Sequence, residues 1–480
     1  MHGTTDHKHQ SGHFQIQIVM TKTLTSTVAL TAVLSSLFMS CGSGNSHENT
    51  ADSSRRALPD TLRVATLYSP TSYFYYRNEP MGYDYSLVSD LARDKGMVLD
   101  IEVANSLQGA LAMLDSGKVD LVAYEVPVTA EYNKRVVHAG PTSLTNQVLV
   151  QPKSDNPVTD VTELIGRDVY VPADSKYQYR LENLNKELGG GINIHPVSRD
   201  TLIMDDMIAM VASGEIPMTV VDSDIARLNR TYYPNLDITM PLSFQQKARW
   251  AVRPDHKWLA DSIDAYFGAD KQREEVSTEF KRYFEISKAI PSVMNYNFRP
   301  DRISQYDKHF RKYAPEINWD WRLLASQGYV ESRFKNGLTS WAGARGIMQI
   351  MPSTARANGV SPRALDNPET SVRVAVKVLD ATDRILAKYV PDPEERKLFD
   401  LAAYNAGIAH ILDAIALAKK YGYDPTKWHN NVEKAMLMKA NPKYFRDPVV
   451  KYGYFRGRET REYVRQVSEF YQRAVKTVHA

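Results

Sequence analysis

The residue with the clearest chemical potential is Glu331, in the carboxy-terminal half of the chain. Leu323 and Leu324 precede it by eight and seven residues, so in a helix its carboxyl would share a face with apolar side chains. Burial on such a face disfavours the charged form and raises the pKa, which is what a general acid needs near neutral pH. On its own, however, Glu331 is better explained as a surface glutamate paired with Arg333 or Lys335.

The residues after Glu331 are small and polar, with Ser340, a glycine-rich turn and then Met348-Gln-Ile-Met-Pro352. No other Asp or Glu occurs before Asp366. Glycoside hydrolases usually need two carboxyl groups, one as the acid and one as the nucleophile or base. The sequence therefore suggests a site with a single carboxyl, although a partner could come from elsewhere in the fold.

Four short motifs occur in a fixed order and change the interpretation of Glu331. They are Glu331-Ser-x-Phe334, Gly346-Ile-Met-Gln-Ile-Met-Pro352, Ala402-Ala-Tyr-Asn-Ala-Gly407 and Glu459-Thr-x-x-Tyr463-Val. Together they resemble the soluble lytic transglycosylase domain, a relative of goose-type lysozyme that cleaves peptidoglycan. The resemblance spans roughly residues 300–475 and implies an all-α, lysozyme-like fold.

The resemblance implies a role for each matching residue. Glu331 matches the catalytic acid and base, and Tyr404 matches a tyrosine that orients this carboxyl by a hydrogen bond. The other matches are substrate contacts: Ser340, Met348 and Gln349 along the sugar cleft, Asn405 beside the carboxyl, and Tyr463 in the cleft wall. Each also has a structural explanation, since Met348 fits a core position and Gly407 fits a helix end.

The reaction implied is non-hydrolytic cleavage of the β-1,4 bond between MurNAc and GlcNAc, which leaves 1,6-anhydro-MurNAc ends. Two alternatives remain open: a muramidase-type hydrolase, and an inactive cell-wall-binding sensor. No cofactor or metal is expected, because the sequence has no His-Glu-x-x-His zinc motif, no Gly-x-Ser-x-Gly elbow and no P-loop.

The region before the helical part alternates between strand-like and helix-like segments. The pattern predicts strands over residues 62–67, 98–103 and 117–124, and helices over residues 86–93 and 107–116. It predicts strands of a second unit over residues 168–171 and 218–221. A last strand, over residues 247–252, is expected to return to the first unit. This spacing predicts a parallel sheet covered on both faces.

Residues 60–285 resemble a family of extracellular solute-binding proteins with two lobes and a cleft between them. That family binds the ligand's α-carboxylate with an arginine at a position where this chain has Tyr132, with Arg135 three residues late. Free amino-acid binding is therefore in question. Asp222 matches a residue that meets a ligand amine, and Tyr73 and Tyr83 could line the cleft; a helix cap and interface packing explain them equally well. A muropeptide or another small molecule is the expected ligand, with a regulatory effect on the helical part.

The charge differs between the two halves of the chain. Residues 287–480 hold 32 Lys+Arg against 20 Asp+Glu, so residues 1–286 hold 27 against 36. A basic carboxy-terminal part suits an anionic polymer such as peptidoglycan. No base-reading motif is present, so nucleic acid is not an expected partner.

Cys41 is the only cysteine in the chain and follows a basic start and an apolar run that begin at Met20. This arrangement resembles a bacterial lipoprotein signal, which implies lipidation of Cys41 and an anchor on the periplasmic side of the outer membrane. An ordinary signal peptide ending in a free cysteine is the alternative, and Met20 could be the true start.

Four parts follow from these patterns: a signal region over residues 1–41, a flexible linker over 42–58, a solute-binding domain over 59–286 and a lytic transglycosylase domain over 287–480. The predicted fold class is a two-lobed α/β domain followed by an all-α lysozyme-like domain.

Overall fold

The computed structural model of the protein describes residues 58–198, 204–289 and 292–479. These residues belong to one unit, Arg55–Ala480. The predicted signal region, Cys41 and all of the predicted linker except residue 58 lie outside the described residues.

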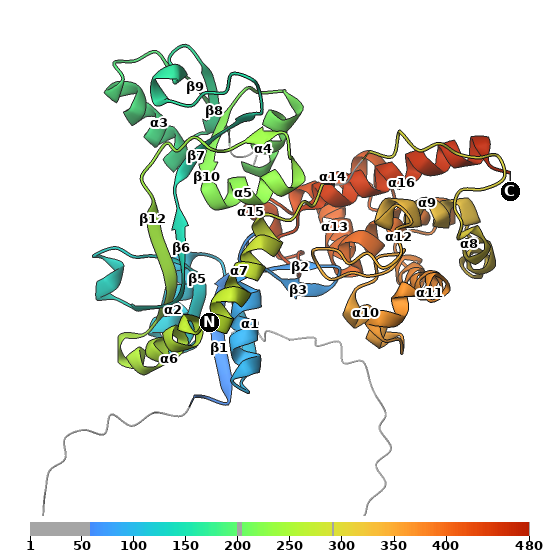
Figure 1. The fold of residues 1–480 in the computed structure, drawn as a ribbon, viewed down its shortest axis with the longest axis horizontal. Helices are drawn as coiled ribbons and strands as arrows, with labels where there is room; N and C mark the ends of the chain where they lie inside the picture. Colours follow the sequence, from blue (N-terminus) through green and yellow to red (C-terminus); the bar gives the residue numbers. More distant parts are fainter. Residues whose placement is uncertain (1–57, 199–203, 290–291, 480) are drawn as a thin grey trace, which may run out of the picture. The chain divides into compact units, whose positions relative to one another are not determined.

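The first lobe is built on a five-stranded sheet with the strand order β4-β1-β5-β12-β6 (Figure 1). Its strands are β1 (Thr61–Leu67), β4 (Val98–Ala104), β5 (Leu121–Pro127), β6 (Val137–Thr145) and β12 (Gln246–Val252). Its helices are α1 (Tyr83–Asp94), α2 (Leu107–Asp115), α6 (Lys257–Gly268) and α7 (Asp270–Phe284). Because side chains alternate along a strand, Val64 and Ala65 enter different hydrophobic clusters on the two faces.

The predicted parallel sheet is only partly correct for this lobe. Strand β1 is parallel to β4 and β5, but β12 is antiparallel to both β5 and β6. Strand β12 returns from the second lobe and so enters the sheet from the opposite end. The sheet is therefore mixed, with its crossover strands on one side.

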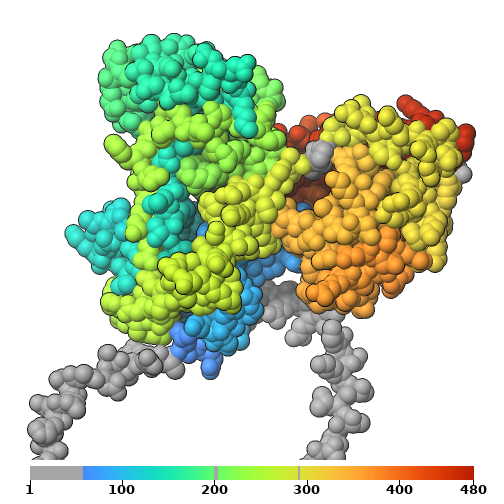
Figure 2. Space-filling model, in the orientation of Figure 1, coloured from blue at the N-terminus to red at the C-terminus, as the bar shows by residue number. Residues whose placement is uncertain are grey.

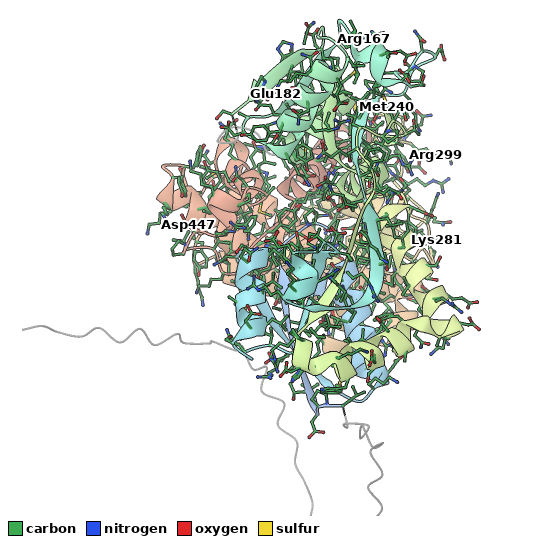
Figure 3. All side chains as sticks on the ribbon, turned by 90° about the vertical axis from the view of Figure 1, so that its left-hand side faces the viewer. Arg167, Glu182, Met240, Lys281, Arg299 and Asp447 are labelled. Carbon is green, nitrogen blue, oxygen red and sulfur yellow. The ribbon has the colours of Figure 1, made fainter. Side chains whose placement is uncertain are left out.

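The second lobe repeats this plan with the strand order β11-β7-β10-β8-β9. Its strands are β7 (Gln147–Pro152), β8 (Asp168–Pro172), β9 (Asn193–Val197), β10 (Thr219–Asp222) and β11 (Leu236–Asp237), and its helices are α3 (Lys176–Glu187), α4 (Met204–Ser213) and α5 (Ser223–Tyr232). In Figure 3, the labelled Arg167, Glu182 and Met240 belong to this lobe, and Lys281 belongs to α7. Figure 2 shows the surface hollowed between the two lobes, where the crossover strands join them.

The carboxy-terminal part is helical, as predicted. Its helices are α8 (Asp307–Tyr313), α9 (Trp321–Ser332), α10 (Pro352–Ala357), α11 (Pro368–Leu386), α12 (Pro393–Ala406), α13 (Ile408–Lys420), α14 (Glu433–Met438), α15 (Pro442–Phe445) and α16 (Gly457–Thr477). One large hydrophobic cluster joins them, with Phe310, Phe399 and Phe470 fully buried. The two-lobed α/β domain and this all-α domain confirm the predicted fold class.

Capping residues explain where several of these helices begin. Asn367 and Asp392 each accept a hydrogen bond from the first turn, and a proline follows each of them. Helix α9 is capped by Asp320, whose side chain accepts a hydrogen bond from the backbone N–H of Arg322. The nearby Asn318 is left-handed and ends a short 3₁₀ helix.

A small hairpin extends from the first lobe toward the helical domain (Figure 1). It consists of β2 (Phe74–Tyr76) and β3 (Glu79–Met81), joined by Arg77 and Asn78. Both joining residues are left-handed, with φ of 51° and 64°, as a tight two-residue hairpin turn requires. Asparagine adopts this conformation readily, but an arginine there is uncommon and strained.

Candidate active site

Glu331 lies in the last turn of α9, and its side chain is only 3% exposed. Helix α9 packs against α16, the long carboxy-terminal helix. Its face toward the core carries Leu323, Leu324 and Val330 in the main hydrophobic cluster. The apolar helix face that the sequence indicates therefore exists, and it places the carboxyl inside the domain rather than at its surface.

Two side chains hold the carboxylate of Glu331. The Tyr463 hydroxyl, on α16, donates a hydrogen bond to Oε1 at 2.7 Å. The Nη2 atom of the Arg77 guanidinium lies 3.0 Å from Oε2 of Glu331, and the side chain of Arg77 is 10% exposed. The alternative pairing with Arg333 or Lys335 does not occur: among the described residues, the hydrogen bonds and ion pairs of the Glu331 carboxylate are with Tyr463 and Arg77.

The surroundings of Glu331 act on its pKa in opposite directions. Burial raises the pKa, and the positive charge of Arg77 and the hydrogen bond from Tyr463 lower it. Burial outweighs the other two, so the pKa is raised from its ordinary value. A carboxyl in this setting can act as a general acid once the arginine has moved away.

The loop after α9 folds back on itself beside Glu331. Arg345 forms antiparallel bridges with both Thr339 and Ile350, and Ser340 accepts a hydrogen bond from the Ala344 N–H at 3.0 Å. At Gly346 the backbone approaches closely, because a Cβ there would lie 2.3 Å from the carbonyl oxygen of Leu365. This close approach explains why the motif needs glycine at this point.

The residues of this loop do not all have the roles that the resemblance implies. Gln349 lines a cavity of about 60 Å³ near the carboxyl, but its side-chain amide donates to the carbonyls of Leu338 and Gly346. Met348 is fully buried in the main cluster and does not line that cavity, which favours the core interpretation over a place in the sugar cleft. Ser340 is partly exposed and shapes the loop.

The two tyrosines exchange their expected roles. Tyr404, predicted to orient the carboxyl, donates instead to the carbonyl oxygen of Met348 at 2.8 Å. Tyr463, predicted as cleft wall, is the residue that donates to Glu331. Asn405 accepts a hydrogen bond from Thr460 at 2.7 Å and so connects α12 to α16 rather than lying beside the carboxyl.

The hairpin tip occupies this site, and no motif in the sequence predicted it. Besides Glu331, Arg77 donates to the carbonyl oxygen of Gln349 at 2.6 Å, and its backbone N–H donates to Ala406 at 3.2 Å. The run of four aromatic residues from Tyr73 to Tyr76, directly before Arg77-Asn78, favours a strand that ends in a turn, but it gives no sign of where the tip of the hairpin lies.

Helix α12 ends where the hairpin tip binds. Gly407, the C-cap residue, has a positive φ of 94°, and a Cβ there would lie 2.4 Å from the Asn78 side-chain oxygen. The Ala409 N–H points at the same oxygen at 3.4 Å, and the His410 ring lies 3.1 Å from the Tyr75 carbonyl. The helix-end motif therefore both terminates α12 and accommodates the tip of the hairpin.

The second lobe contacts the same domain through α16 and the residues before it. Arg458 pairs with Asp206 at 2.6 Å, Arg456 donates to the Asn229 side chain at 2.6 Å, and the Tyr454 hydroxyl lies 3.2 Å from Asp205. The first lobe and the second lobe thus hold the helical domain through separate sets of contacts.

The three residues predicted for the solute-binding cleft lie in different environments. Tyr73 is 5% exposed and packs among other tyrosines, with its hydroxyl 3.3 Å from that of Tyr75. Tyr83 lines a cavity of about 290 Å³ between the lobes. Asp222 occupies the N-cap position of α5, but its carboxylate binds Lys176 and Tyr177 instead of the helix backbone.

Within the described ranges, no three His, Cys, Asp or Glu side chains are grouped as ligands for a metal ion. Along the same residues, none of the helices combines the length and apolar character that crossing a bilayer requires.

The chain matches two known families in the regions that the two domains occupy. The family described as Transglycosylase SLT domain matches residues 308–426, and the family of bacterial extracellular solute-binding proteins, family 3, matches residues 62–286. Fold and site together define an enzyme of the lytic transglycosylase class that carries a solute-binding domain.

Full-length relatives identify the family. A protein of Desulfosudis oleivorans is 32% identical over 412 residues, covering 85% of this chain and 88% of the relative. One of Pseudomonas fluorescens is 32% identical over 416 residues, covering 85% and 84%. Both are named membrane-bound lytic murein transglycosylase F, and the chain belongs to this family. Among solved structures, the L-cystine solute receptor of Neisseria gonorrhoeae matches 48% of this chain and 95% of its own, with 17% identity and a TM-score of 0.40.

Proposed function

We propose that this transglycosylase cleaves the β-1,4 bond between MurNAc and GlcNAc in peptidoglycan and leaves 1,6-anhydro-MurNAc ends. The observation that carries the proposal is the buried carboxyl of Glu331, held by Tyr463 in a domain that belongs to the lytic transglycosylases. The basic carboxy-terminal part of the chain suits an anionic glycan.

In the proposed reaction, the protonated Glu331 carboxyl gives its proton to the glycosidic oxygen, and the bond from that oxygen to C1 of MurNAc breaks. The N-acetyl carbonyl of the same sugar stabilises the positive charge at C1. The Glu331 carboxylate then takes the proton of the C6 hydroxyl, and O6 bonds to C1. The proton returns to Glu331, and no water is consumed.

A hydrolase of the muramidase type would need a way to activate water, usually a second carboxyl. The cavity near Glu331 is lined, among the described residues, by Arg77, Gln349, Tyr404 and apolar or small polar side chains, with no Asp or Glu. The lining thus supports a single-carboxyl mechanism. Tyr463 would fix the orientation of Glu331 through both proton transfers.

Digestion of purified sacculi tests the reaction. We expect the wild-type protein to release fragments with anhydro ends, and Glu331→Gln to lower the rate by about 10²–10⁴-fold. Mass spectrometry of the fragments separates the two chemistries, because a hydrolase leaves muramyl ends that are heavier by one water. Reducing ends in place of anhydro ends, or full activity of the glutamine variant, would contradict the proposal.

We also propose that the solute-binding domain regulates this reaction. In the arrangement described, Arg77 occupies the place where the glycosidic oxygen must meet Glu331, so this arrangement cannot react. The first lobe supplies the hairpin, and the second lobe holds α16 through Arg458 and Arg456. A change in the angle between the lobes strains one of these attachments.

A ligand that draws the lobes together would therefore favour withdrawal of the hairpin, and by linkage an open active site would favour ligand binding. A soluble muropeptide is the expected ligand. Muropeptides added to the full-length protein should bind to the solute-binding domain and raise the rate of sacculus digestion. If muropeptides do not bind and the rate does not change, regulation is refuted and the catalytic proposal remains intact.

The anchor is a separate part of the proposal. We propose that Cys41 is lipidated and holds the enzyme on the periplasmic side of the outer membrane, next to its glycan substrate. Cys41→Ser should move the protein from the membrane fraction to the soluble periplasmic fraction and abolish labelling by a fatty-acid analogue. A protein that stays with the membrane after this change would contradict the anchor.

A further inference from the structure

Three buried polar side chains lie behind the hairpin, and the proposed reaction does not use them. They are His410 and Asp413 on α13 and Lys439, the C-cap residue of α14. The side chains of Lys439 and Asp413 are 0% and 4% exposed, and His410 is fully buried. The Nζ atom of Lys439 donates to Oδ2 of Asp413 at 2.6 Å and to Nδ1 of His410 at 2.8 Å. The three side chains thus form one continuous network.

The ammonium of Lys439 determines which ring nitrogen of His410 carries the proton. An ammonium can only donate hydrogen bonds, so Nδ1 of the ring must accept, and the proton of the neutral ring must be on Nε2. Nε2 lies 3.1 Å from the carbonyl oxygen of Tyr75, in strand β2 of the hairpin. Because a carbonyl oxygen can only accept, this contact is a hydrogen bond only in the tautomer that Lys439 selects.

Both groups keep these protonation states near neutral pH. Burial lowers the pKa of Lys439 to about 8, and the charge of Asp413 opposes a further fall. Burial, and then the charge of Lys439, hold the pKa of His410 well below its ordinary value, so its ring is neutral. The hydrogen bond to Tyr75 therefore depends on the tautomer of His410 and not on a charged ring.

Asp413 connects the same network to the aromatic side chain of the hairpin. Its carboxylate also accepts hydrogen bonds from the backbone N–H groups of Lys451 and Tyr452, both at 2.9 Å. The Tyr452 ring packs edge-on against the Tyr75 ring, with centroids 5.7 Å apart. One buried carboxylate therefore orders two contacts of Tyr75, through His410 to its backbone and through Tyr452 to its ring.

Stability alone does not account for the buried pair of Lys439 and Asp413. Taking two charges out of water is costly, and an apolar pair of similar volume often leaves a protein equally stable or more stable. An apolar pair could not direct the proton of His410 toward the hairpin. Tyr75 lies two residues before Arg77 in the chain, so a fixed Tyr75 carbonyl also limits how far Arg77 can move.

We propose that His410, oriented by Lys439 and Asp413, is the positioning residue that holds the hairpin in the active site. The network selects the tautomer with the proton on Nε2, and the hydrogen bond to Tyr75 keeps Arg77 at Glu331. The inference deepens the proposed regulation and rests on it only for the effect on digestion, not for the hold on the hairpin.

The histidine spectrum of the wild-type protein tests the tautomer. The full-length protein in detergent is labelled with ¹⁵N at its 12 histidines, and the signals of His410 are those missing from His410→Gln. We expect a protonated Nε2 and an unprotonated Nδ1 from about pH 6 to 7.5. A proton on Nδ1, or a ring that becomes charged in this range, would overturn the inference.

Two amide substitutions separate positioning from packing. The amide nitrogen of His410→Gln can take the place of Nε2, whereas that of His410→Asn reaches only the place of Nδ1. Hydrogen exchange of residues 74–81, measured by mass spectrometry, should therefore be faster in His410→Asn than in His410→Gln by about tenfold or more. A role in packing alone would affect both variants alike, so equal exchange in the two folded variants refutes the inference.

Lysine variants test the other end of the network. Lys439→Met removes the group that selects the tautomer and should also speed exchange of the hairpin. Lys434→Met, at an exposed lysine of α14, is the matched control and should exchange as the wild type does. Unchanged exchange in Lys439→Met would refute the role of the lysine. The thermal midpoint shows which variants are folded, and the spectrum of the wild type decides if His410→Asn is not.

Sacculus digestion by the same variants separates this inference from the proposed regulation. Faster exchange of the hairpin together with a raised rate of digestion supports both. Faster exchange without a raised rate would refute inhibition by the hairpin and leave the positioning role of His410 intact. Equal exchange in His410→Asn and His410→Gln would refute only the positioning role.

Discussion

The guanidinium of Arg77 lies 3.0 Å from the carboxylate of Glu331, although 254 residues separate them in the chain. Both side chains are buried, at 10% and 3% exposure. A buried ion pair is weak support for stability, because the two groups lose their hydration. Its consequence for the proposed reaction is direct: the arginine neutralises and covers the carboxyl that we propose as acid and base.

The first prediction concerns the release of this block. Arg77→Ala should raise the rate of sacculus digestion without ligand by about tenfold or more, because the hairpin tip loses its contacts with Glu331 and with the Gln349 carbonyl. Dye-labelled sacculi give the initial rate. Arg93→Ala, an exposed arginine of the first lobe, is the control and should behave as the wild type. An unchanged or lower rate in folded Arg77→Ala would show that the hairpin does not inhibit.

The second prediction concerns pH. The charge of Arg77 lowers the pKa of Glu331, so removal of that charge must raise it further above its ordinary value. A general acid works while it is protonated, and a higher pKa keeps it protonated to higher pH. The alkaline limb of the pH–rate profile of Arg77→Ala should therefore lie at higher pH than that of the ligand-free wild type. A shift toward lower pH would contradict this sign.

The third prediction distinguishes the two tyrosines of the site. Tyr463→Phe removes the hydrogen bond to Glu331 and should lower kcat by about tenfold or more with little change in KM. Tyr404→Phe removes a hydrogen bond to the Met348 carbonyl and should mainly lower the free energy of unfolding, by about 1 kcal/mol. The motif resemblance alone predicts the opposite order, so kcat and urea unfolding of both variants decide between them.

Local patterns in the sequence were sufficient for the fold class and for the apolar helix face that carries Glu331. Caps such as Asn367 act on the next turn only, and apolar spacing identifies the face of α9 that holds Glu331. The contacts that the sequence did not reveal are between distant segments. Arg77 is assigned to the site only when the hairpin is placed against α12, and the tyrosine roles depend on how α16 crosses α9.

A last prediction uses a second buried carboxyl of the helical domain, Asp400 on α12. It is 1% exposed, and burial, followed by the charge of Asp383, raises its pKa to about 8 from an ordinary 3.8. Between pH 4 and pH 8 the folded protein therefore holds a proton that the unfolded chain releases, so the free energy of unfolding falls as pH rises through this range.

Asp400→Asn removes that dependence, because a neutral amide replaces a carboxyl that must stay neutral. At pH 8 the variant should be more stable than the wild type by about 1–3 kcal/mol, and near pH 4 the two should be similar. Urea unfolding at both values measures the difference. Asp380→Asn, at a partly exposed carboxyl paired with Arg384 on α11, is the matched control and should show no such pH-dependent gain. If Asp400→Asn were equally destabilised at both pH values, Asp400 would be ionised in the folded protein, and its carboxylate would have to be stabilised by the neighbouring Arg396.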